Sequence, residues 1–128
     1  MQLLDGVRIM YKLAIVGSRR FNNYGHMCRV LETPRKNGLI KLIVSGGAAG
    51  ADTLAQRYAK DSGLPIIIYY PDWKKYKKAA GVIRNQYIVD DADMMIAFAY
   101  DDSRGTRDSI KKMKKAKKPV AVIELGEK

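Results

Sequence analysis

Apolar residues occur in short continuous runs that alternate with longer segments of mixed polarity from Lys12 onward. The five apolar runs are residues 12–16, 39–44, 66–70, 94–98 and 119–123. A run that is apolar at consecutive positions, rather than at every second one, is typical of a strand buried on both faces, as in a parallel sheet. The pattern therefore predicts five strands in one mainly parallel sheet.

Helical segments are predicted in the intervals between these runs. The spacing of apolar residues predicts helices over residues 24–32, 52–62 and 79–89, and a lysine-rich helix before the last strand. Pro34 and Gly38 are expected to end the first helix, and Gly63 the second. Because parallel strands need helical crossovers, the predicted fold is a single doubly wound α/β three-layer sandwich over residues 12–125. Residues 1–11 are interpreted as an N-terminal extension.

The composition excludes several classes of protein. A chain of 128 residues is long enough to bury a core in one domain and too short for two full domains. Its single cysteine, Cys28, cannot form an internal disulfide or a cysteine-built zinc site. No apolar run approaches the roughly 18 residues that a membrane span requires. We therefore expect a cytoplasmic protein with no membrane association, no metal and no cofactor.

The formal net charge of +11 is concentrated in two lysine patches. The first patch contains Lys74, Lys75, Lys77 and Lys78, and the second contains Lys111, Lys112, Lys114, Lys115, Lys117 and Lys118. In the second, Ile110, Met113 and Ala116 share one side of a helix, which favours a solvated lysine face opposite them. In the first, Trp73 and Tyr76 are interleaved with lysines, a pattern that suits single-stranded nucleic acid. Nucleic acid is therefore a candidate partner through the lysine patches.

Three polar loops that contain glycine each follow a predicted strand, at residues 17–20, 45–52 and 101–107. In a doubly wound sheet, ligands bind at the carboxyl ends of the strands, and we expect all three loops at that edge. Small residues permit close backbone approach, and a helix N-terminus favours an anion. The loops therefore predict a phosphate-binding site. The alternative is that the glycines only form tight strand-to-helix turns.

The predicted ligand-binding residues come from these loops and from two segments between them. They are Gly17, Ser18, Arg19, Ser45, Gly46, Gly47, Ala48, Gly50, Ala51, Asp52, Trp73, Arg84, Asn85, Ser103, Gly105 and Thr106. Arg19, Arg84 and Arg104 are candidates for phosphate because a guanidinium forms paired hydrogen bonds to it. Trp73 has a second interpretation as a packing residue, and Asp52 has one as a helix N-cap.

Five motifs lie in order along the chain. They are Gly17-Ser18-Arg19-x-Phe21, Val44-Ser45-Gly46-Gly47-Ala48-x-Gly50-Ala51-Asp52-x-Leu54-Ala55, Trp73-x-x-Tyr76, Ala80-Gly81-x-Ile83-Arg84-Asn85 and Ser103-Arg104-Gly105-Thr106-x-Asp108. Together they resemble the YspA/cpYpsA-related branch of the SLOG superfamily, over residues 12–124. The resemblance implies a Rossmann-like fold that binds a nucleotide or a nucleotide-derived ligand. It also permits a homodimer.

Two kinds of relative in that superfamily imply other functions. LOG-type enzymes hydrolyse the N-glycosidic bond of nucleoside monophosphates and carry P-G-G-x-G-T-x-x-E, but Ser109 stands here at the position of that glutamate. Such a hydrolase would need Asp52, Asp102 or Asp108 as its catalytic carboxylate. Smf/DprA proteins bind single-stranded DNA and have a loop similar to residues 45–52.

The leading hypothesis from the sequence is binding or sensing of a nucleotide-derived small molecule at the carboxyl edge of the sheet. Backbone amides of residues 46–51 would hold its phosphate. N-glycosidic hydrolysis of a nucleoside monophosphate is the first alternative, and single-stranded nucleic-acid binding is the second. The loops and the resemblance favour a binding protein over an enzyme.

Overall fold

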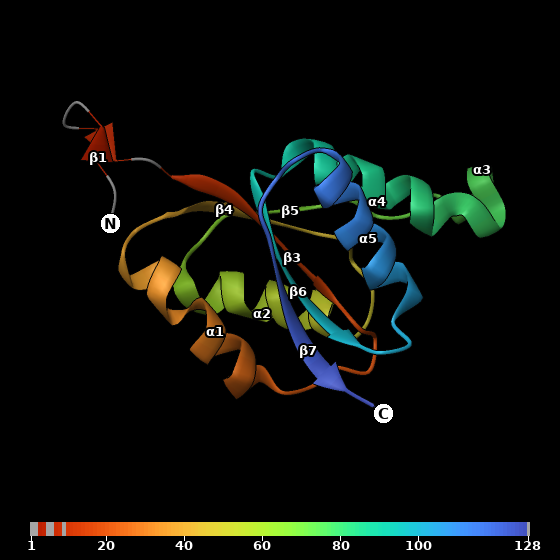
Figure 1. Cartoon of the computed structure of the whole chain (residues 1–128), viewed down its shortest axis with the longest axis horizontal. Coiled ribbons are helices and arrows are strands. Elements are labelled where there is room, and N and C mark those ends of the chain that lie inside the picture. The colour runs from red at the N-terminus through yellow and green to blue at the C-terminus, as the bar shows by residue number, and fades with distance from the viewer. Residues whose placement is uncertain (1–2, 5–6, 9, 128) are drawn as a thin grey trace.

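The computed structural model describes residues 3–4, 7–8 and 10–127 of the chain, and its body is a five-stranded sheet between two layers of helices (Figure 1). The strands are β3 (Tyr11–Gly17), β4 (Ile40–Ser45), β5 (Ile66–Ile68), β6 (Met94–Tyr100) and β7 (Val120–Gly126). Their order is β5-β4-β3-β6-β7, and every neighbouring pair is parallel. The predicted doubly wound, Rossmann-like sandwich is confirmed, with a wholly parallel sheet.

A separate two-stranded antiparallel sheet precedes this body. It pairs β1 (Leu3–Leu4) with β2 (Val7–Arg8). Both strands fall within the segment predicted as an N-terminal extension, and the main sheet begins at Tyr11.

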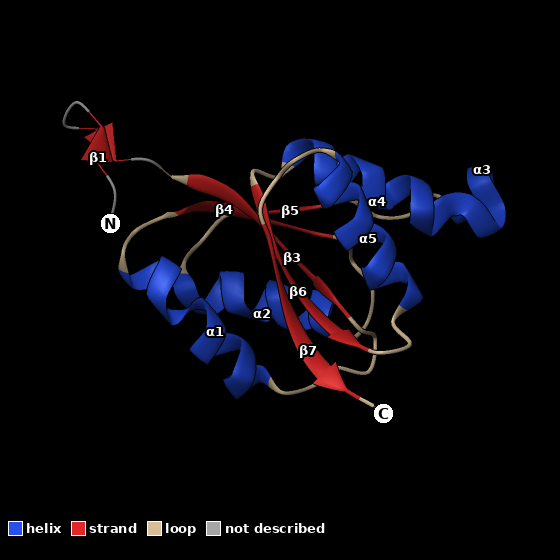
Figure 2. Ribbon diagram, in the orientation of Figure 1, coloured by secondary structure: helices blue, strands red, loops and turns tan. Residues whose placement is uncertain are grey.

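Helices cover both faces of the sheet (Figure 2). One face carries α1 (Tyr24–Lys36) and α2 (Ala51–Ser62), and the other carries α4 (Ala80–Asp91) and α5 (Arg104–Lys115). The short α3 (Trp73–Tyr76) and a 3-10 turn, η1 (Lys77–Ala79), lead into α4. Leu13 and Ile15 pack in the core cluster that includes α1 and α2, whereas Ala14 and Val16 pack in the cluster that includes α4 and α5. Because alternate side chains of a strand face opposite layers, the central positions of β3 are apolar on both faces.

The end of the first helix differs from the prediction. Helix α1 passes through Pro34 and ends at Lys36, so the interpretation of Pro34 as its terminus is wrong. The last turn closes around the proline because the N–H groups of Asn37 and Leu39 donate to the carbonyls of Thr33 and Pro34. Gly38, with φ of 67°, then turns the chain toward the sheet, as expected.

Two further predicted boundaries were wrong. Strand β5 ends at Ile68, two residues before the end of its apolar run. Ala116 is exposed at the C-cap of α5 and is not part of the buried stripe, which ends at Met113. In both cases the apolar run continues past the end of the regular element, so composition alone extends the element too far.

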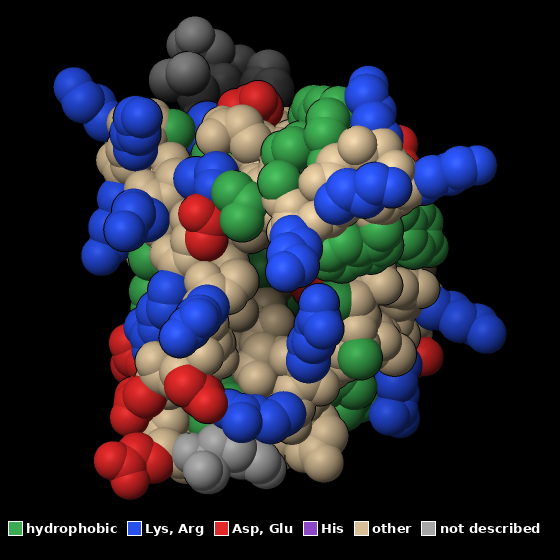
Figure 3. Space-filling view, turned by 90° about the vertical axis from the view of Figure 1, so that its right-hand side faces the viewer, with side chains coloured by type: hydrophobic (Ala, Val, Ile, Leu, Met, Phe, Trp, Pro, Cys, Tyr) green, Lys and Arg blue, Asp and Glu red, His purple; other side chains and the backbone are tan. Residues whose placement is uncertain are grey.

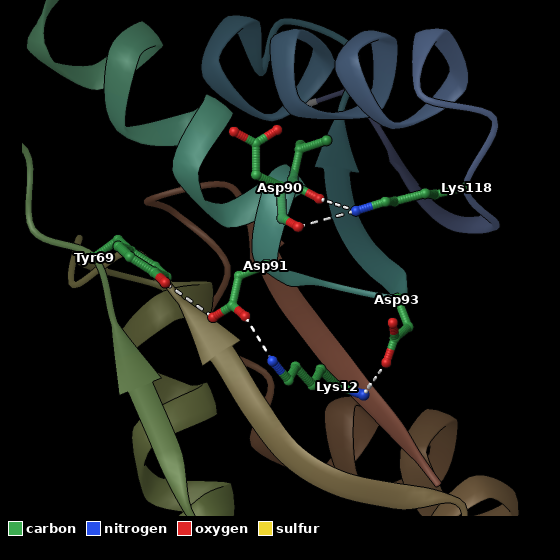
Figure 4. Close-up of polar contacts among 7 residues, drawn as sticks. Lys12, Tyr69, Asp90, Asp91, Asp93 and Lys118 are labelled. Carbon is green, nitrogen blue, oxygen red and sulfur yellow. Dashed lines mark hydrogen bonds and ion pairs between the residues drawn. The ribbon is translucent and has the colours of Figure 1, made fainter. Parts of the chain in front are cut away.

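Polar contacts fix the C-terminal end of α4 against the sheet (Figure 4). The Asp91 carboxylate accepts from Lys12 Nζ (3.0 Å) and from the Tyr69 hydroxyl (2.9 Å). The backbone N–H of Lys12 donates to Asp93 (2.8 Å). Burial alone would raise the pKa of Asp91, but the hydrogen bonds from Lys12 and Tyr69 outweigh it and lower that pKa. These contacts fix the position of α4 and of the side chains that it carries.

Two lysines of the second patch are structural. Lys118 Nζ donates to the carbonyl oxygens of Val89 (2.7 Å) and Asp90 (3.1 Å) at the last turn of α4 (Figure 4). Lys112 pairs with Asp108 and is largely buried, so its assignment to a solvated face is wrong. A cation at a helix C-terminus satisfies free carbonyl groups and complements the helix dipole. The solvated face therefore consists of the remaining lysines of the patch.

Met113→Ala is expected to lower the free energy of unfolding by about 2–5 kcal/mol, because it leaves a cavity in a fully buried position under α5. Lys114→Ala, at the next and exposed position of the same helix, is the matched control and should change stability little. Urea unfolding with both midpoint and slope recorded makes the measurement. Equal effects of the two substitutions would contradict the described packing of α5.

Candidate functional site

The three loops meet at the carboxyl edge of the sheet. They connect β3 to α1, β4 to α2 and β6 to α5, and with the first turns of α4 they surround a cleft of about 470 Å³. Figure 3 shows this hollow with Lys and Arg side chains around it. The predicted residues that line it are Gly17, Ser18, Arg19, Ala48, Asp52, Arg84, Asn85, Ser103, Gly105 and Thr106. Segments distant in sequence therefore form one surface.

Other predicted residues do not line the cleft: Ser45, Gly46, Gly47, Gly50, Ala51 and Trp73. The first five belong to the β4–α2 loop and its flanks, where they fix the backbone. Ser45, for example, is fully buried, and its hydroxyl donates to the Ile15 carbonyl (2.8 Å). Trp73 is half exposed on α3, outside the cleft wall. The structure therefore separates residues that face the cleft from residues that hold its loops.

Two glycines allow the β3–α1 and β4–α2 loops to touch. A Cβ on Gly17 would lie 2.5 Å from the Phe98 carbonyl oxygen and 2.8 Å from the Ala51 Cβ. Gly50 has φ of 74°, and a Cβ there would overlap the Ser18 carbonyl oxygen. The Ala51 N–H donates to that same oxygen (3.1 Å). Gly17 and Gly50 are thus required by the close approach of one loop to the other.

Gly46 lies between the two most buried charged groups of the cleft. A Cβ at this position would lie 2.6 Å from Arg84 Nη1 and 2.9 Å from Asp52 Oδ2. The carbonyl oxygen of Gly46 accepts a hydrogen bond from Arg84 Nη1. The missing side chain therefore lets a guanidinium from α4 reach the backbone of the β4–α2 loop.

Arg84 is oriented by neutral acceptors. Besides Gly46, its Nη1 lies 3.5 Å from the Tyr69 carbonyl oxygen, and its Nε donates to Asn85 Oδ1 (3.0 Å). Burial lowers the pKa of Arg84, the charge of Asp52 opposes this effect, and the neighbouring positive charge of Arg19 adds to it. Arg84 forms no ion pair with any residue in the described part of the chain.

Asp52 is 5% exposed at the second residue of α2. Its Oδ2 accepts from the Ala48 N–H (3.0 Å), whereas its Oδ1 has no hydrogen-bond partner among the residues described. The nearby Ser45 hydroxyl donates its one proton to the Ile15 carbonyl oxygen and therefore does not donate to Asp52. Burial raises the pKa of Asp52 despite its hydrogen bond and the charges of Arg84 and Arg19. Asp52 is not the N-cap, since Gly50 occupies that position without a side-chain hydrogen bond.

The other two candidate carboxylates lie apart, Asp102 in the β6–α5 loop and Asp108 on α5. Asp102 lines the cleft and pairs with Arg20 of the β3–α1 loop. Asp108 is outside the cleft wall, where it accepts from Asn85 Nδ2 (3.0 Å) and from Lys112. The structure therefore does not bring Asp52, Asp102 and Asp108 together in one catalytic arrangement.

The structure also adds cleft residues that the list of predicted ligand-binding residues did not include. Arg20 and Lys78 bring positive charge to the wall, as does Arg104, which the sequence had already made a phosphate candidate, and Val82 and Ile88 add an apolar side. Arg20 follows directly after a predicted residue, and Lys78 belongs to the first lysine patch, so both had a signal in the sequence. The turn through η1 into α4 places Lys78 at the cleft.

No group of three metal-ligating side chains and no helix suited to crossing a membrane occurs within the described ranges.

Comparisons with known proteins assign the family. The family model for YspA, cpYpsA-related SLOG proteins matches residues 11–76, which contain β3, α1, β4, α2, β5 and α3. The chain belongs to this SLOG family. Gene 61 protein of Mycobacterium phage D29 is 37% identical to the SLOG chain over 93 residues, which cover 68% of the chain and 73% of the phage protein.

Two solved structures share the fold of this SLOG chain. DNA processing protein A (DprA) from Streptococcus pneumoniae superposes with a TM-score of 0.70 at 21% identity, over 88% of the SLOG chain and 50% of DprA. DNA processing protein A from Helicobacter pylori is described with its single-stranded DNA binding mode. It superposes with a TM-score of 0.68 at 25% identity, over 89% of the SLOG chain and 65% of the Helicobacter pylori chain. The SLOG chain thus spans between half and two thirds of these larger chains.

Asp52→Asn is expected to reduce the loss of stability that follows a rise in pH. The folded-state pKa of Asp52 is raised above its ordinary value of 3.8, so the folded chain binds more protons between the two values. The free energy of unfolding therefore falls as the pH rises through that window, and the full cost of the ionised carboxylate persists above it.

Urea unfolding of both proteins from about pH 4 to pH 7 measures this effect. Asp91, whose pKa is lowered, has the opposite dependence and is present in both proteins, so the difference between them isolates Asp52. A difference that stays constant over the whole range would contradict the raised pKa.

Proposed function

We propose that this chain binds a nucleotide or nucleotide-derived ligand in the cleft, with a phosphate against Arg84 and Arg19. The observation that carries the proposal is the unpaired charge of Arg84. This guanidinium is half-buried, and its Nε and Nη1 are occupied by neutral oxygens. Its Nη2 has no hydrogen-bond partner among the described residues, and the residue lines the cleft.

A bound anion would relieve the electrostatic cost of this arrangement. Burial and Arg19 both disfavour the charged form of Arg84, and the nearby Asp52 is itself disfavoured in its ionised form. A phosphate near the guanidinium supplies the missing negative charge, in the fork geometry that arginine offers. Such a contact is charge-assisted and gains strength where water is partly excluded.

The rest of the cleft suits a nucleoside. Val82 and Ile88 give one wall an apolar surface, and Ser103 and Thr106 bring hydroxyl groups to another. A cleft that combines an apolar side with a few polar groups is typical of small-molecule sites, and its volume of about 470 Å³ is within their usual range. We therefore assign the phosphate to the arginine side and the nucleoside to the wall formed by α4 and α5.

The surroundings of the three candidate carboxylates favour binding over hydrolysis. Asp52 holds the Ala48 N–H and is buried, Asp102 pairs with Arg20, and Asp108 faces Asn85 and Lys112 outside the cleft. A general acid or base must reach the reacting atom within hydrogen-bond distance. Asp108 lies outside the cleft, Asp102 is paired with Arg20, and Asp52 already accepts from the Ala48 N–H, so the three carboxylates form no joint acid–base arrangement, which supports the binding hypothesis over N-glycosidic hydrolysis.

Calorimetric titration with AMP, ADP-ribose, NAD and cyclic nucleotides tests the proposal. At least one is expected to bind, and Arg84→Gln should weaken that binding about tenfold or more, because a charge-assisted hydrogen bond is lost. Arg29→Gln is the matched control, since Arg29 is exposed on α1 away from the cleft. Absence of binding by every compound at millimolar concentration, or equal losses in the two variants, would refute the proposal.

Single-stranded DNA is the second candidate ligand. The favouring observation is an exposed aromatic and basic surface beside the cleft: Tyr70 is 67% exposed, Trp73 is 50% exposed, and Lys78 reaches the cleft wall. Lys75 Nζ also lies 5.0 Å from the centre of the Tyr76 ring. Aromatic rings can stack on bases while lysines neutralise phosphates, and the Helicobacter pylori neighbour is described with a single-stranded DNA binding mode.

Replacement of Lys74, Lys75, Lys77 and Lys78 by Gln is expected to weaken binding of an oligo-dT strand and to reduce the slope of affinity against salt concentration. Replacement of Lys111, Lys114, Lys115 and Lys117, four exposed lysines of the second patch, changes the net charge equally and is the control. Fluorescence anisotropy at several salt concentrations gives both quantities. Equal effects of the two fourfold variants would contradict a specific role of the first patch.

A further inference from the structure

We propose that the outer part of the cleft is a second anion subsite, centred on Arg20, and that the ligand carries two linked phosphates. This inference rests on the proposed binding of a nucleotide and specifies its class as one with a diphosphate group. In the structure the carboxylate of Asp102 occupies the subsite and stands in for the outer phosphate.

The evidence is an ion pair across the cleft. Arg20 belongs to the β3–α1 loop and Asp102 to the β6–α5 loop, and both side chains line the cleft. Arg20 Nη2 pairs directly with Asp102 Oδ1. The backbone of Arg20 is held by the Ser18 hydroxyl (3.1 Å), and its guanidinium lies 5.3 Å from the centre of the Tyr100 ring. Arg20 is therefore positioned at the site independently of Asp102.

A carboxylate and a phosphate oxygen pair present the same chemistry to a guanidinium, because both accept its paired hydrogen bonds. The Asp102 side chain is 67% exposed and that of Arg20 is 43% exposed, so their ion pair contributes little to stability. An incoming phosphate can replace Asp102 at small cost. Arg104, which also lines the cleft and has no ion pair among the described residues, adds a second cation to this subsite.

The two subsites belong to different walls. Arg84 comes from α4 and contacts Gly46 of the β4–α2 loop, whereas Arg20 contacts Asp102 of the β6–α5 loop. Each guanidinium is held by its own set of partners and cannot move to the other without losing them. One phosphate at Arg84 would leave Arg20 with Asp102, and a second phosphate is required to use both cations.

Calorimetry with AMP and ADP compares one phosphate with two. We expect the wild-type chain to bind ADP about tenfold more tightly than AMP, because a second charge-assisted contact forms. Arg20→Gln should remove most of this preference while AMP binding persists. Asp102→Asn should raise the affinity for ADP about threefold, and that for AMP less, since the internal competitor is lost.

Asp101→Asn is the matched control. It makes the same change of charge at the next position, and Asp101 does not line the cleft. The increase in affinity for ADP must be larger for Asp102→Asn than for Asp101→Asn. Binding of ADP by the Asp102→Asn variant but not by the wild type would also support the inference. Binding of AMP without preference for ADP, or equal effects of the two substitutions, would overturn it and leave the proposed function standing. If none of these proteins binds AMP or ADP, and the wild type binds no compound of the wider panel, both the second subsite and the proposed function are refuted.

Discussion

The close contact between the first turn of α2 and the β3–α1 loop sets the geometry of the whole carboxyl edge. The Ala51 N–H donates to the Ser18 carbonyl, and Gly17 and Gly50 have no side chains that would separate the two segments. This contact brings the helix N-terminus next to the loop that carries Arg19 and Arg20. The cleft forms because two loops from neighbouring parallel strands are held at backbone distance, while α4 and α5 form its other side.

The arrangement of charged groups in the cleft lowers the stability of the ligand-free chain. Arg84 is held by carbonyl and amide oxygens, Asp52 is buried with one oxygen unpaired, and Gly46 lies between them. Burial of polar groups without full pairing reduces stability, by about 1–3 kcal/mol for each unpaired group. Natural proteins accept such costs chiefly where a ligand completes the pairing. Arg84, whose charged form is disfavoured by burial in the free chain, is therefore the residue to which we assign the phosphate of the ligand.

The excess positive charge of the chain has several separate roles. Lys112 neutralises Asp108, and Lys118 binds the last carbonyls of α4, so these two lysines stabilise the fold. Lys78 reaches the cleft wall from the first patch, and the exposed lysines of α5 remain in solvent. A single net charge of +11 conceals these differences. Only the position of each lysine relative to α4 and the cleft distinguishes a structural ammonium group from one that is free to attract an anion.

The sequence alone was sufficient for the alternation of the five main strands with α1, α2, α4 and α5, for the parallel sheet and for the family, because apolar runs and glycine-rich turns are local patterns. The order β5-β4-β3-β6-β7 across the sheet came from the structure. The sequence also placed Arg19, Arg84 and Asp52 among the candidate site residues, and all three line the cleft. Only the tertiary structure decided which of these face the cleft, because Arg84 and Gly46 are 38 residues apart and meet through the packing of α4. The tertiary structure also pairs Asp102 with Arg20, and it places Asp108 in hydrogen bonds with Asn85 and Lys112. Burial and pairing depend on contacts between distant segments, and a local pattern of residues contains no information about which of them will meet.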